Sequence, residues 1–337
     1  MFGRQNNSTW PNLNITLPST PPSKQRQPSA GLSVWNAIRI FQDLKDPHSE
    51  ACHDGQKTIK LPPEEYLQLL RTLDCEPLQE FVSDKVRWDY DPKAGLLYIR
   101  TPTPVHNFFA SSIAAEIYKQ LQCIANVESA AGKFAGQISN GGSSRIYLKE
   151  DDCEGEPGNS KVFLQHQPDA QFQYHGTAYP GVVLEVSYAQ KGKSLQKLAR
   201  HYILHSNGNI KVVIGVAINS LGTNESTVSL WRPSYIQEGG EEFDILDVQQ
   251  EIKSQPFRAQ DGSYANQAQS IHLDLSDFAP DQLSADIQGI QLEITFEKLA
   301  YFLGLAEHMH RLREISPGIK SERKTRKRKL SPSSAEE

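Results

Sequence analysis

The clearest pattern of hydrophobic and polar positions lies between residues 167 and 203. From Ala170 to Tyr174 apolar residues occupy every second position, which predicts a half-buried strand. Residues 181–187 form a nearly continuous apolar run, typical of a central strand buried on both faces, and one charge, Glu185, interrupts it. Ser194 then caps a predicted helix with an apolar face of Leu195, Leu198, Ala199, Tyr202 and Ile203.

Upstream of this stretch, the periodicity predicts a helix, a hairpin and a second helix. The first helix opens with two prolines after Leu61, and the hairpin joins residues 85–90 to residues 96–100 through a turn at 91–95. Thr103 caps the second helix, which runs to about Gln122 with apolar residues at every fourth position. Glu116 borders that apolar face. It is a candidate site carboxylate, or a boundary residue that reaches solvent along its stem.

Downstream, Ile210 to Ile218 is a second buried strand. A strand, a helix and a strand in this order predict a parallel pair joined by a right-handed crossover. Further strands are expected at residues 226–231, 243–248 and 271–275, and a helix at residues 295–312. The pattern therefore predicts an α/β protein with a mixed central sheet flanked by helices.

Composition bounds the domain organisation. The 337 residues suffice for one large core or two small ones, and no apolar run is long enough to cross a bilayer. The first residues contain no apolar signal segment, and the four cysteines form no CxxC pair, so we expect a non-secreted protein with reduced thiols. We expect a disordered tail at residues 1–30, a docking or linker segment at 31–58, the main domain at 59–235, a C-terminal extension with strands and a terminal helix at 236–315, and a disordered basic tail at 316–337.

The charge is unevenly distributed along the chain. Lys320 to Lys329 holds seven basic residues and one acidic residue, typical of a nuclear localisation signal or a nucleic-acid-binding tail. This segment predicts a nuclear protein that an import receptor recognises, although a solvated tail without a role remains the alternative. The net charge is −5 and the segment contributes +6, so the rest of the chain carries −11. Such a body repels DNA unless Lys191, Lys193, Lys197 and Arg200 line a local groove.

Pro168-Asp169 followed by Glu185-Val186-Ser187 resembles the signature of the PD-(D/E)xK nuclease superfamily. The order of elements from Leu61 to Ile218, about half of the chain, is similar to a restriction-endonuclease-like family that is abundant in cyanobacterial genomes and to uncharacterised fungal proteins with the same core. The resemblance implies a restriction-endonuclease-like core in which Asp169 and Glu185 hold Mg²⁺ or Mn²⁺.

In that superfamily a lysine beside the metal orients the attacking water and stabilises the developing charge. A serine, Ser187, stands at its usual place here, so Lys197 or Lys191 would have to supply it. The alternatives are that Asp169 caps a turn, that Glu185 faces solvent and that both lysines are ordinary surface residues. The resemblance thus implies a Mg²⁺-dependent nuclease that hydrolyses DNA phosphodiesters. The competing hypothesis is a catalytically inactive nuclease fold that serves as a nuclear binding or scaffold module.

Overall fold

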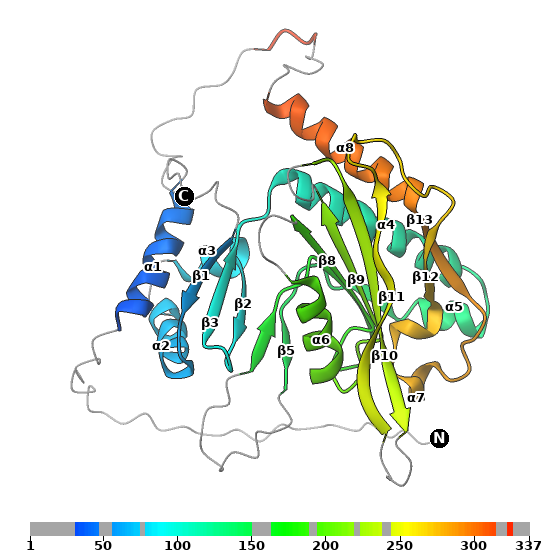
Figure 1. Cartoon of the computed structure of the whole chain (residues 1–337), viewed down its shortest axis with the longest axis horizontal. Coiled ribbons are helices and arrows are strands. Elements are labelled where there is room, and N and C mark those ends of the chain that lie inside the picture. The colour runs from blue at the N-terminus through cyan, green and yellow to red at the C-terminus, as the bar shows by residue number, and fades with distance from the viewer. Residues whose placement is uncertain are drawn as a thin grey trace, which may run out of the picture.

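The computed structural model describes residues 31–46, 56–74, 78–149, 163–188, 194–218, 223–237, 244–314 and 322–325. It is a mixed α/β protein with two main sheets flanked by helices and a smaller two-stranded sheet (Figure 1). The tails expected at 1–30 and 316–337 fall outside the described residues, apart from 322–325. None of the described helices has the length and apolar character needed to cross a membrane.

The first sheet contains five strands in the order β1-β3-β2-β6-β5. Its predicted hairpin is confirmed, with β2 (Arg87–Asp91) paired to β3 (Leu96–Arg100), and β1 (Gln56–Lys60) extends it. The other two strands are short, β5 (Ile146–Leu148) and β6 (Leu164–His166). β2 begins later than expected because residues up to Lys85 continue a short helix, α3 (Gln79–Lys85).

Two further helices belong to the hydrophobic core of this first sheet. α1 (Leu32–Lys45) contacts α2 (Pro63–Asp74), and both contribute to one cluster with residues of β2 and β3. The apolar group near the start of the described chain therefore docks on the protein itself, burying Val34, Ala37, Ile38 and Phe41. Trp88 and Tyr90 of β2 lie in the same cluster.

The second sheet contains six strands in the order β11-β10-β9-β8-β7-β4. β8 (Val182–Tyr188) and β9 (Val212–Ile218) are parallel and are joined through α6 (Leu195–His205), as predicted. The remaining pairs are antiparallel, so the sheet is mixed. They involve β4 (Ile138–Asn140), β7 (Ala170–Tyr174), β10 (Ser226–Gln237) and β11 (Asp244–Arg258).

Helices cover both faces of the second sheet. Alternate residues of β8, Val182, Leu184 and Val186, lie in one core cluster with the apolar face of α4 (Pro104–Ala125). Val183 belongs to the opposite cluster, together with Leu198 and Tyr202 of α6. Both predicted caps are present, because Thr103 accepts a hydrogen bond from the His106 amide at 3.3 Å and Ser194 accepts one from the Lys197 amide at 3.2 Å.

The C-terminal elements pack beside α4. β12 (Ser270–Asp274) and β13 (Gln291–Thr295) form the two-stranded sheet, and α8 (Phe296–Glu314) contacts α4 (Figure 1). Three short helices complete this region: α5 (Ala130–Ala135), η4 (Leu275–Phe278) and α7 (Asp281–Ser284). β11 is longer than the expected strand at 243–248 and pairs with β10 over most of its length, so this part of the chain belongs to the same sheet as β8.

Candidate functional site

The two predicted site carboxylates lie on neighbouring strands. β7 and β8 are antiparallel with Ala170 opposite Leu184, so Asp169, directly before β7, lies across from Glu185. The Asp169 amide also donates to the Leu184 carbonyl at 3.0 Å. Asp169 stands where the chain passes from β6 in the first sheet to β7 in the second. Neither carboxylate side chain has any exposed surface (0%), so neither acid faces solvent.

Asp169 is held by donors from three elements. Its Oδ1 accepts a hydrogen bond from Arg87 Nη1 at 2.7 Å, and its Oδ2 accepts one from the Val186 amide at 2.7 Å. The His106 ring nitrogen Nε2 lies 3.3 Å from the same Oδ2 and 3.1 Å from the Val186 carbonyl. The first turn of α4 buries the His106 ring against β8.

Glu185 points toward α6. Its Oε1 accepts a hydrogen bond from the Tyr202 hydroxyl at 2.7 Å, and its Oε2 lies 4.0 Å from Arg100 Nη1. Burial, followed by the neighbouring charges of Glu185 and Asp89, raises the pKa of Tyr202 well above its ordinary value. The phenol therefore keeps its proton over the physiological range and acts as a fixed donor to the buried carboxylate.

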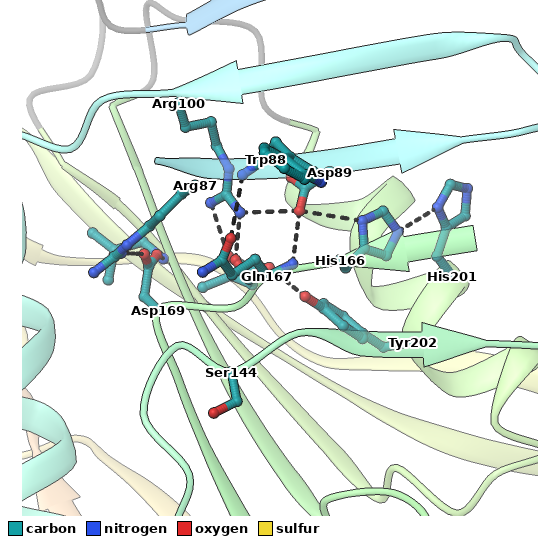
Figure 2. A network of polar contacts seen from close by, with 12 residues as sticks. Arg87, Trp88, Asp89, Arg100, Ser144, His166, Gln167, Asp169, His201 and Tyr202 are labelled. Atoms are coloured by element: carbon teal, nitrogen blue, oxygen red, sulfur yellow. Dashed lines mark hydrogen bonds and ion pairs between the residues drawn. The ribbon is translucent and has the colours of Figure 1, made fainter. Parts of the chain in front are cut away.

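Arg100 occupies the centre of this polar network (Figure 2). Its Nη2 donates to Asp89 Oδ1 at 3.0 Å and to the Gln167 carbonyl, while the Gln167 amide donates to the same Asp89 oxygen at 2.8 Å. Burial alone would lower the pKa of Arg100. The charges of Asp89, Glu185 and Asp169 outweigh that effect and raise the pKa above its ordinary value. A permanent positive charge thus lies among three carboxylates.

A pair of histidines extends the network toward α6. His166 Nδ1 lies 3.6 Å from Asp89 Oδ1, and His166 Nε2 lies 2.9 Å from His201 Nδ1. Figure 2 shows the two rings in line with Asp89. Burial, followed by the proximity of His166 and Lys197, lowers the pKa of His201 to about 3. His201 is therefore neutral at physiological pH.

The predicted lysines do not join the two carboxylates within the described residues. Lys197 Nζ donates to Asp91 Oδ2 at 3.0 Å, and its side chain is half-exposed at 52%. Lys191 and Lys193 lie outside the described residues. Arg200 pairs with Asp247 at 3.1 Å. Ser187, which stands at the usual lysine position, is buried.

Glu116 lies away from the two predicted site acids, at the contact between α4 and α8. Its Oε1 accepts hydrogen bonds from Lys298 Nζ at 2.7 Å and from Gln120 Nε2 at 2.9 Å. Burial by itself would raise the pKa of Glu116. The hydrogen bonds from Lys298 and Gln120 lower this pKa by more than burial raises it, so the pKa of Glu116 is below its ordinary value. The bond from Lys298 joins α8 to α4, whereas the bond from Gln120 lies within α4.

Sequence reasoning missed Arg87, Asp89 and Arg100 as site residues. The alternation in β2 puts Trp88 and Tyr90 on one face and Arg87 and Asp89 on the other, but it does not show what the charged face meets. In the structure Asp89 is 5% exposed, because the charged face of β2 and β3 meets β6, β8 and α6. The sequence did contain one indication of this network: Asp89 of β2 and Arg100 of β3 lie on the same face of the predicted hairpin, where they can pair.

The residues present do not fit a Mg²⁺ or Mn²⁺ ion as they are arranged. Such ions need about six oxygen ligands, several of them water or phosphate oxygens. Here both Asp169 oxygens contact protein donors, and a guanidinium lies beside Glu185. In the described part of the chain, no three His, Cys, Asp or Glu side chains are grouped so that they could hold a metal ion.

Comparison with models of known protein families finds no match, and a search of curated proteins finds no relative.

Proposed function

We propose that this chain is a catalytically inactive protein with a restriction-endonuclease-like core that acts as a binding or scaffold module in the nucleus. The observation that carries the proposal is the burial of Arg100 among Asp89, Asp169 and Glu185. The order of β7, β8, α6 and β9, with acids at the start of β7 and inside β8, supports the nuclease-like core.

The arginine supplies in permanent form the charge compensation that a metal supplies in a nuclease. A divalent ion about 4 Å from the guanidinium would be repelled by about 8 kcal/mol at an effective dielectric constant of about 20. The three carboxylates attract such an ion over similar distances, but the charges of Arg87 and Arg100 already neutralise two of their three negative charges. A reaction that depends on a metal-activated water is therefore opposed by the resting arrangement of the site.

The nuclear part of the proposal comes from the basic segment, Lys320 to Lys329. Seven positive charges in ten residues suit the acidic surface of an import receptor, or phosphates of DNA. Changing all seven lysines and arginines to alanine in the full chain should shift a fluorescent fusion from the nucleus to the cytoplasm. Unchanged nuclear accumulation would remove this part of the proposal and leave the inactive-site part standing.

A second candidate function is the Mg²⁺- or Mn²⁺-dependent nuclease itself. The pairing of β7 with β8 favours it, because it sets Asp169 across from Glu185 as a metal-binding pair requires. Arg87 has 21% of its side chain exposed, so it could leave Asp169 when a phosphate draws it away. Lys197 or Lys191 would then have to approach the water.

Cleavage of supercoiled plasmid distinguishes the two functions. The full chain is incubated with plasmid and Mg²⁺ or Mn²⁺, beside Asp169→Ala and Glu185→Ala, and all three are checked for folding by circular dichroism. We expect no nicking above a buffer control from any of them, and no heat of Mn²⁺ binding by calorimetry. Nicking by the wild type that both folded variants lose would overturn the proposal in favour of the nuclease.

A further inference from the structure

Helix α8 has a second apolar face in addition to the one that it buries. Leu299, Leu303 and Ala306 are buried in the core shared with α4. Opposite them Tyr301, Leu305 and Met309 are exposed by 54%, 41% and 37%. At about 100° per residue, a spacing of four turns each side chain by only about 40°, so these three form one stripe along the helix.

A glycine lies beside the middle of this stripe. Gly304 is inside α8. Apart from its chain neighbours and the nearby backbone of α8 itself, no atom of the described residues lies within 4 Å of the position that its Cβ would occupy. A glycine inside a helix costs roughly 0.5–1 kcal/mol relative to alanine. Packing within the described chain gives no reason for this cost, since a methyl group would fit. The close approach of a second backbone to α8 at Gly304 would explain why a glycine stands there.

Two exposed charges flank the stripe at opposite ends of α8. Glu297 is in the first turn and Arg311 in the last, and neither has an ion-pair partner among the residues that the structure describes. They are about 21 Å apart along the axis at 1.5 Å per residue. The residue midway between them is Gly304.

We infer that α8 is the interface of a homodimer in which the helices of two copies cross antiparallel at Gly304. The two-fold axis then brings Glu297 of each copy to Arg311 of the other, so the dimer contains two such ion pairs. Leu305 of each copy lies over Gly304 of the other, and both apolar stripes become buried. A parallel arrangement would instead set Glu297 against Glu297 and Arg311 against Arg311, which repel.

Sedimentation of the full chain at about 1–100 µM tests the dimer. We expect the wild type to approach twice the monomer mass of 37.8 kDa as its concentration rises. Leu305→Glu should stay monomeric, because it buries two carboxylates in the apolar centre of the interface. The matched control is Leu283→Glu, at an exposed leucine of α7, which should dimerise like the wild type.

Charge reversal tests the antiparallel register independently. Glu297→Arg and Arg311→Glu should each weaken the dimer about tenfold, since each replaces two attractions by two repulsions, and the double variant should return to within about threefold of the wild type. Three results would each overturn the inference: a wild type that is monomeric throughout, a dimer that Leu305→Glu leaves intact, or a double variant no stronger than the singles. Circular dichroism of every variant separates a lost interface from a lost fold.

Discussion

Replacing Arg100 with methionine removes the central cation of the polar network while keeping a long apolar stem. The variant leaves Asp89 without its 3.0 Å partner and Glu185 without the guanidinium 4.0 Å away. The side chains of these acids are only 6% and 0% exposed, so water cannot solvate the carboxylates that lose their positive partner. Breaking a buried ion pair from one side costs about 3–5 kcal/mol, and we expect a loss of that size in the free energy of unfolding.

Thermal unfolding followed by circular dichroism measures this loss. A large domain loses about 2–4 °C of Tm per kcal/mol, so the Tm of Arg100→Met should fall by at least roughly 6 °C. Arg71→Met is the matched control, because Arg71 is exposed on α2, and its Tm should stay within about 1 °C of the wild type.

A double variant separates the charge from the packing. Asp89→Asn keeps an oxygen that accepts from the Gln167 amide but removes the buried negative charge. If charge imbalance causes the loss, Arg100→Met with Asp89→Asn should recover about 1–3 kcal/mol relative to the sum of the single changes. Strict additivity, or an Arg100→Met protein as stable as the wild type, would refute the view that Arg100 neutralises this site.

Three further changes probe other contacts. Tyr202→Phe removes the donor to Glu185 and should lower the free energy of unfolding by about 1–3 kcal/mol in urea titrations, without changing the volume of the core. The pKa of His201 is lowered from 6.5 to about 3, so the folded protein resists a proton that the unfolded chain accepts. Stability should therefore fall as pH drops from about 6.5 toward 3, and His201→Asn should flatten that dependence in melts at a series of pH values. Gly181→Ala would set a Cβ 2.3 Å from the Asp277 carbonyl, and the backbone strain should cost about 3 kcal/mol or leave the chain insoluble on expression.

The elements with a strong periodic signal could be predicted from the sequence. The apolar run with a single acid is β8, and the strand after the next helix is its parallel neighbour, β9. Thr103 and Ser194 cap their helices as expected, because a hydroxyl directly before an amphipathic run can accept a hydrogen bond from a free amide of the first helical turn.

The partners of the site carboxylates could not be predicted in the same way. A strand pattern shows which residues share a face, but it does not show what that face meets. Arg100 reaches Asp89 within its own hairpin, whereas its contact with Glu185 depends on how the two sheets pack. Lys197 was expected near the acids from its place on α6, and its side chain instead meets Asp91 of β2. Tertiary packing decides these pairings, so residues of the same helix can have partners in different strands: on α6, Lys197 pairs with Asp91 of β2 and Tyr202 with Glu185 of β8.

The charged face shared by β2 and β3 also has a consequence for how the protein is made. On the ribosome, Arg100 emerges well before the residues that complete its surroundings, Glu185 and Tyr202. At roughly 5–20 residues per second, the roughly 100 residues to Tyr202 take about 5–20 s to synthesise. During that interval the nascent hairpin can cover its Trp88 and Tyr90 side with α1 and α2, while its Arg100 side stays hydrated. The β2–β3 hairpin therefore acquires its contacts in two stages. Its Trp88 and Tyr90 side can pack first against α1 and α2, and its Arg100 side packs only after α6 has been translated.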